Sequence, residues 1–158
     1  MLQDMEETSI IGDYREVTLN LFGGFRRKVF YSDLEIPYPE GKLVVSTTDK
    51  SGIITHANKA FVELSGYNLD ELIGSPHSIL RHPDMPSVAF KDLWDKVAQG
   101  RFWQGYVKNL RKDGAYYWVK ATVIPNVRKG EVVGYTSVRR KPSRVKVNEA
   151  IALYKTLT

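Results

Sequence analysis

A short stretch between two prolines carries three side chains that could bind a ligand. Arg81, His82 and Asp84 lie within four residues, with Pro83 and Pro86 fixing the backbone around them. Each proline holds its own φ and disfavours helix in the residue before it. A cation, an imidazole and a carboxylate in such a loop can hold a polar, phosphate-bearing ligand. The pattern equally fits a turn whose charges face water and whose Pro86 begins the next helix.

Two side chains in predicted strands suit contact with a planar ligand. Trp103 begins a strand after Gly100, and its indole could stack on a ring, donate its N–H, or simply fill the core. Asn109 is unusual within a strand, because asparagine is depleted there. If the Asn109 side chain points inward, its amide could hydrogen-bond the edge of a ligand ring. Alternatively, Asn109 lies in a bulge or points outward.

Composition indicates an ordinary globular chain of 158 residues, 42% hydrophobic and 26% charged, which suggests one domain with an extension. The net charge is +5, but the only dense basic runs are Arg26–Lys28 and Arg139–Lys141. Neither run has the aromatic interleaving of a single-strand binder. We therefore expect solvated turns or partner contacts there, and no nucleic-acid binding.

The chain has no cysteine, which excludes thiol nucleophiles, disulfides and cysteine-based zinc sites and fits a reducing cytoplasm. No apolar run approaches ~18 residues, so we expect no membrane span. The acidic first residues are unlike a signal peptide. We expect a cytoplasmic protein that reaches the inner face of a membrane only through a partner.

Residues 1–40 read as an N-terminal extension that ends in an extended linker at Ile36–Gly41. Alternation over Val17–Leu21 predicts a short strand, which Gly23 and Gly24 end. The apolar residues that follow these glycines are too numerous for a tail that is free in water. We expect it to pack on the sheet face of its own or a second subunit.

We expect residues 41–141 to form a core domain. We expect residues 142–158 to form a terminal helix that carries a signal outward. In this core we expect Trp94 to be buried, and of Tyr117 and Trp118 one to point inward and the other outward. The predicted elements are a hairpin at 43–48 and 53–57, helices at 59–64 (N-cap Asn58), 68–73 and 87–98, strands at 103–110, 115–125 and 132–138, and a helix after Ser143.

Several short sequence motifs follow one another as they do in PAS domains. They are Asp49–Asn58, Leu64–Tyr67 with Glu71–Gly74, and Val107–Asn109 with Lys112–Gly114 and Tyr117–Val119. Three more, Arg81–Pro86, Phe102–Gly105 and Gly134–Arg139, resemble the aerotaxis and energy-taxis subfamily of PAS sensors. The resemblance covers about residues 40 to 158. It implies an α+β fold, a five-stranded antiparallel sheet with helices over one face.

The resemblance also implies a function. Members of the subfamily typically bind FAD without a covalent bond and report its redox state to a chemotaxis module. It implies a redox or oxygen sensor that is not an enzyme, signals through a membrane-bound chemoreceptor partner and forms a homodimer through the sheet or the extension. The positions that match the family's FAD-related residues are Asn58, His77, Arg81, His82, Asp84, Trp103 and Asn109.

Two other functions stay open at this point. A cofactor-free PAS interaction module would explain the apolar leader. A haem sensor would use an axial histidine, and His56, His77 and His82 are the only histidines. A hydrolase or a nicotinamide enzyme is not expected, because the chain lacks the His-Glu-x-x-His and G-x-G-x-x-G patterns. No metal site is expected.

Overall fold

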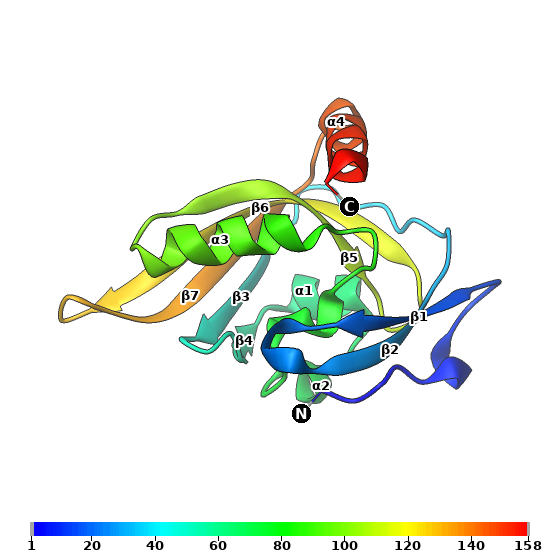
Figure 1. Cartoon of the computed structure of the whole chain (residues 1–158), viewed down its shortest axis with the longest axis horizontal. Helices are drawn as coiled ribbons and strands as arrows, with labels where there is room; N and C mark the ends of the chain where they lie inside the picture. The colour runs from blue at the N-terminus through cyan, green and yellow to red at the C-terminus, as the bar shows by residue number, and fades with distance from the viewer. Residues whose placement is uncertain (1, 158) are drawn as a thin grey trace.

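The computed structural model describes residues 2–157, and a five-stranded antiparallel sheet in the order β4-β3-β7-β6-β5 is its centre (Figure 1). The strands are β3 (Val44–Asp49), β4 (Ile54–Ala57), β5 (Trp103–Leu110), β6 (Tyr116–Arg128) and β7 (Glu131–Arg140). This architecture confirms the predicted fold class.

Helices between β4 and β5 cover one face of the sheet. They are α1 (Lys59–Ser65), α2 (Leu69–Leu72), the 3-10 helix η3 (His77–Leu80) and α3 (Ser87–Ala98). Asn58 caps α1 by accepting from the amide of Phe61 at 3.0 Å, and Gly66 ends it in the left-handed conformation. The sequence predicted α1, α2 and α3 but not η3, because a single 3-10 turn has no periodicity to detect.

The main core lies between the sheet and these helices, and Phe61, Leu72, Leu80, Val97 and Val119 are almost fully enclosed there. Trp94 was expected to be buried; it is half-buried and packs against this core edge-to-face on Tyr135, with ring centroids 5.6 Å apart. Each of these side chains excludes water from the inner face of the sheet.

On the other face of the sheet, the C-terminal helix α4 (Arg144–Thr156) packs on the part formed by β5 and β6 (Figure 1). Tyr154 stacks on Trp118 with centroids 6.3 Å apart and donates its hydroxyl to the carbonyl of Tyr106 at 2.6 Å. Tyr117 and Trp118 point to opposite faces, as expected, but both are buried because α4 packs over Trp118.

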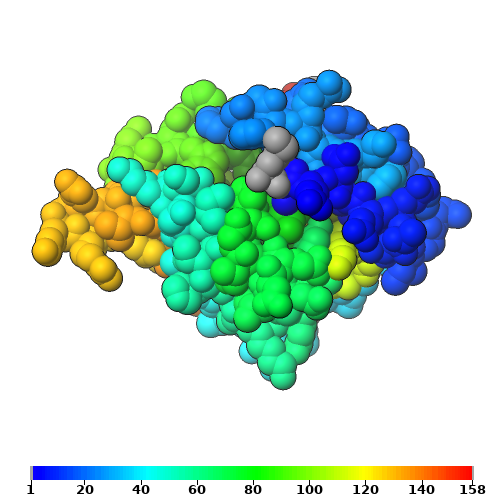
Figure 2. Space-filling view, turned by 90° about the horizontal axis from the view of Figure 1, so that it is seen from below, coloured from blue at the N-terminus to red at the C-terminus, as the bar shows by residue number. Residues whose placement is uncertain are grey.

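The leader forms a hairpin of β1 (Arg15–Asn20) and β2 (Arg26–Tyr31), joined by the 3-10 turn η2 (Phe22–Gly24); a further 3-10 turn, η1 (Glu7–Ser9), precedes it. Ser32 donates its amide to Gly114 at 2.9 Å, which holds the hairpin at the β5–β6 turn. Figure 2 shows the N-terminal segment in dark blue against the green surface that includes η3.

The structure supports one expectation for the leader in part and corrects another. The leader packs on its own chain, at the end of β5 and against η3, while α4 packs on the β5–β6 part of the outer sheet face. Its second strand, β2, escaped prediction because three of its six residues are the basic run Arg26–Lys28. Within that run Arg27 is buried, so the run is not simply a solvated turn.

Deleting residues 1–35 should cause aggregation or a change in oligomeric state. The deletion uncovers Leu110, which is fully buried against Val29 and Phe30. Light scattering on the purified protein measures the effect. Phe22→Ala is the matched control, because Phe22 is 91% exposed and its loss should change nothing. A truncated chain with the mass and solubility of the full chain would show that the leader is dispensable.

Candidate functional site

A buried arginine on the inner face of the sheet is the most unusual feature of the interior. Arg139 on β7 is only 2% exposed, and no carboxylate of residues 2–157 forms an ion pair with it. Its Nη2 donates to Ser46 Oγ at 2.9 Å and lies 2.6 Å from His77 Nε2. The guanidinium carbon is 4.7 Å from the ring centre of Phe61. Buried charges are normally paired, so this cation lacks its usual counter-charge.

Burial sets the charge state of this cluster. Burial, with a smaller effect of Arg139, lowers the pKa of His77 to about 3, so the imidazole is neutral and Nε2 accepts from Arg139. Burial lowers the pKa of Arg139 to about 10, which leaves it cationic at neutral pH. The His77 ring also stacks on Phe61, with centroids 6.2 Å apart. The cluster therefore carries one net positive charge.

Several polar atoms on the inner face of the sheet are buried and have no hydrogen-bond partner among the described residues. They are Arg139 Nη1, the Tyr117 hydroxyl and Thr48 Oγ1. Burial raises the pKa of Tyr117 to about 12, so its hydroxyl stays protonated. Asn109, 5% exposed, lies directly opposite Tyr117 in the β5–β6 pairing. Such orphaned groups are rare in a finished core and favour a bound polar molecule.

The predicted loop residue Arg81 lies at the edge of this cluster. Its backbone forms an antiparallel bridge with Asn109, so the segment after η3 runs alongside β5. The guanidinium donates to Met85 O at 3.3 Å and Ser87 Oγ at 3.4 Å and lies over the ring of Phe90. Its Nε is buried without a partner among the described residues, and burial lowers its pKa. Arg81 thus also lacks a carboxylate partner in the part of the chain described.

His82 and Asp84 are separate from the buried cluster. The His82 ring packs edge-on between Tyr31 and Tyr116, and its Nδ1 accepts from the amide of Asp84 at 3.0 Å. Burial lowers the pKa of His82 to about 3. Asp84 is exposed and pairs with Lys108 at 2.7 Å. These contacts shape the loop that presents Arg81.

Asn58 and Trp103 are already engaged within the protein. Besides capping α1, Asn58 accepts from the amide of Val45 and donates to the carbonyl of Leu43. The Trp103 indole N–H donates to Asp92 at 3.0 Å, and its ring lies against Gly105, where a Cβ would come within 2.4 Å. Trp103 therefore connects β5 to α3.

Of the seven predicted residues, His77 and Asn109 face the buried cluster and Arg81 borders it, whereas the other four lie elsewhere. Sequence reasoning missed Arg139, Tyr117, Ser46 and Thr48. The run that contains Arg139 was expected to form a solvated turn or a partner contact; the solvated turn is wrong for Arg139, which is buried within its own chain. Strand alternation was the available signal, since Arg139 shares its face with buried Tyr135 while Arg140 is exposed.

The chain matches known proteins over most of this region. The family described as PAS fold matches residues 54–139. The aerotaxis receptor of Escherichia coli K12 is 46% identical over 77% of this chain, and the biofilm dispersion protein BdlA of Pseudomonas aeruginosa is 34% identical over 56%. The chain spans 24% and 22% of these two relatives, about a quarter of their length.

Solved structures show the same fold. The light-state blue-light photoreceptor Aureochrome1 LOV has a TM-score of 0.61 at 26% identity, covering 68% of this chain and 90% of that one. A PAS domain from Colwellia psychrerythraea has a TM-score of 0.58 at 27% identity, and the match covers 65% of this chain and 87% of that one.

Neither a membrane-spanning helix nor a metal-binding group is present in the described part of the chain. Over residues 2–157 no helix is long and apolar enough to cross a bilayer. The same residues contain no cluster of three or more histidines and acids that could hold a metal ion.

The chain should lose stability on acidification below about pH 6.5. His82 is neutral when folded but titrates near 6.5 when unfolded, so between pH 6.5 and 3 the unfolded chain binds more protons. Its contribution is largest above pH 6.5 and falls by about 1.4 kcal/mol per pH unit below it.

Urea unfolding at pH 7 and pH 5 measures this loss. His82→Gln should reduce the pH dependence by about half, because His77, whose pKa is also lowered to about 3, contributes a similar share; His56→Gln, a change at an exposed histidine, should not reduce it. An unchanged pH dependence in His82→Gln would show that His82 is not held neutral.

Proposed function

The chain belongs to the PAS-fold family, of the type found in aerotaxis receptors, and on that premise we propose that it is an FAD-binding redox or oxygen sensor for energy taxis. The family resemblance supplies the cofactor class. The observation that carries the proposal is the buried Arg139, which has orphaned polar atoms beside it and no carboxylate partner among the described residues.

The residues present suit a flavin ring. The isoalloxazine is planar, and its polar edge carries carbonyl oxygens that accept hydrogen bonds. Arg139 and Tyr117 offer unused donors, and the amide of Asn109 can both donate and accept. Phe61 supplies an aromatic surface in the same cluster. We propose that Arg139, His77, Asn109 and Tyr117 hold the ring and that Arg81 pairs with the pyrophosphate.

When bound, FAD would supply reversible redox chemistry, and reduction changes the charge and protonation of its ring. Arg139 would respond to such a charge, because its present partners, Ser46 and His77, are neutral and weaker than an ion pair. Movement of the guanidinium would change its contact with His77 on η3. The buried cation thus converts a charge difference into a change in hydrogen bonding.

Strand β5 could carry this change to the other face of the sheet. Asn109 faces the cluster, while three residues earlier the carbonyl of Tyr106 accepts from Tyr154 on α4. A small shift of β5 would strengthen or weaken that contact and bias α4 between docked and released positions. We propose that α4 passes the signal to a membrane-bound chemoreceptor partner on the cytoplasmic side, with no substrate turned over and with homodimerisation as part of the assembly.

An absorption spectrum of freshly purified full chain tests this function. We expect flavin bands in the blue and near ultraviolet, and FAD as the nucleotide released on denaturation. A Soret band would favour haem instead. A colourless protein that takes up no added FAD would favour a cofactor-free interaction module and would contradict the proposal.

Arg139→Met should abolish flavin binding without unfolding the protein. The substitution removes a buried cation and leaves an apolar side chain of similar length, so the cofactor-free form should be at least as stable as the wild type. Flavin per protein after reconstitution should fall at least about tenfold, which corresponds to the loss of one charged hydrogen bond. Arg140→Met is the control, because Arg140 is exposed on the same strand. Full occupancy in a folded Arg139→Met variant would remove Arg139 from the site.

A further inference from the structure

A second buried arginine lies in the leader. Arg27 on β2 is 3% exposed, whereas its neighbours Arg26 and Lys28 are exposed. No carboxylate of the described residues forms an ion pair with it, and its bonds all go to neutral acceptors. Removing a long cation from water is costly, so this placement needs well-made hydrogen bonds.

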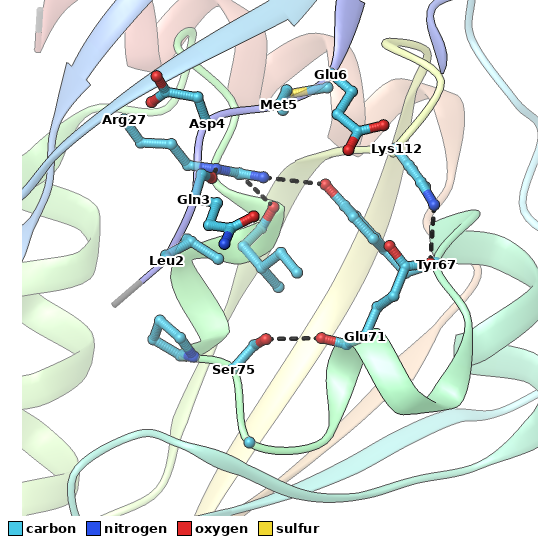
Figure 3. A pocket seen from close by; sticks show the side chains of 13 residues that line it. Leu2, Gln3, Asp4, Met5, Glu6, Arg27, Tyr67, Glu71, Ser75 and Lys112 are labelled. Atoms are coloured by element: carbon cyan, nitrogen blue, oxygen red, sulfur yellow. Dashed lines mark hydrogen bonds and ion pairs between the residues drawn. The ribbon is translucent and has the colours of Figure 1, made fainter. Parts of the chain in front are cut away.

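The guanidinium of Arg27 joins three separate segments (Figure 3). Nε donates to the carbonyl of Gln3 at 2.8 Å, Nη1 to the carbonyl of Ile79 at 3.0 Å, and Nη2 to the Tyr67 hydroxyl at 3.2 Å. These acceptors belong to the N-terminal segment, to η3 and to the loop between α1 and α2. One side chain therefore fixes the leader to two parts of the helical layer.

The contact lies in the wall of a groove of about 330 Å³ between the N-terminal segment and the helical layer. Figure 3 shows Arg27 at this groove with Tyr67 opposite and the Glu71–Lys112 ion pair beside it. Leu2 also packs on the core cluster that contains Ile79, and the hydrogen bonds of Arg27 add a polar attachment of the leader to η3.

The carbonyl of Ile79 is an important place to hold η3. His77, two residues before it, contacts Arg139, and Arg81, two residues after it, pairs its backbone with Asn109. A single 3-10 turn has few hydrogen bonds of its own, so an external donor in its middle limits how far both ends can move.

We infer that Arg27 is a positioning residue for the cofactor site: by binding the carbonyl of Ile79, it holds η3 so that His77 and Arg81 keep their places. This inference rests on the proposed function. It makes the leader a working part of the site. The alternative is that Arg27 only fastens the leader, in which case its loss would lower stability and leave the site unchanged.

The test compares the full chain with Arg27→Met, Arg27→Lys, Tyr67→Phe and the exposed control Arg26→Met. Each protein is loaded with FAD and diluted, and cofactor release is followed by flavin fluorescence well below every melting midpoint. We expect Arg27→Met to release FAD about tenfold faster than wild type, since the Ile79 carbonyl loses its donor. Arg27→Lys should be intermediate, because an ammonium cannot span three acceptors. Tyr67→Phe should show a smaller increase, and Arg26→Met none.

Hydrogen exchange of the η3 amides, measured without FAD, gives a second and independent result. Arg27→Met should speed exchange of the amides of Ile79 and Arg81, which donate to the carbonyls of Pro76 and Ser78. A variant with release within about twofold of wild type and unchanged η3 exchange would overturn the inference, even if its melting point falls. If Arg27→Met does not fold, Arg27→Lys and Tyr67→Phe decide by the same two readings. If the wild type binds no FAD, the proposed function fails, and the exchange data alone decide whether Arg27 holds η3.

Discussion

The buried charge of Arg139 is the constraint on which this account depends. A guanidinium on the inner face of a sheet, bonded only to neutral groups, is costly in a protein that holds nothing else there. The surrounding side chains do not neutralise this charge. His77 is neutral, and the Tyr117 hydroxyl has no hydrogen-bond partner among the described residues. A ligand that accepts hydrogen bonds, and that can become negative, would satisfy the cation and its neighbours together.

The rest of the fold connects this cluster to both flanking segments. The strand β5 carries Asn109 on its inner face and the Tyr106 carbonyl, bound by α4, on the outer side. The leader reaches the cluster from the other direction through Arg27 and η3, and it also pairs with α4 through Glu35 and Arg144. Extension, core and terminal helix are therefore one connected structure around the candidate site.

Local signals in the sequence were enough to predict the order of the core elements. Asn58 is an N-cap by type and position, and the apolar spacing after Ser87 defines α3. The candidate site was harder to predict, because burial of a cation depends on contacts distant in sequence. Arg139 binds Ser46, 93 positions away, and Arg27 binds Ile79, 52 positions away. The partners of both arginines are distant in sequence, and only the alternation along β7 hints that Arg139 is buried, so both basic runs resemble solvated turns. The resemblance found His77 and Asn109, yet it could not separate them from Asn58 and Trp103, which are engaged elsewhere.

A crystal structure of the chain reconstituted with FAD tests the central claim most directly. The account predicts an isoalloxazine ring on the inner face of the sheet, with Arg139 donating to its polar edge and Asn109 within hydrogen-bond distance. It also predicts that the Arg139 guanidinium leaves His77 or Ser46 to make that bond. A ring bound elsewhere, with Arg139 still joined only to Ser46 and His77, would contradict it.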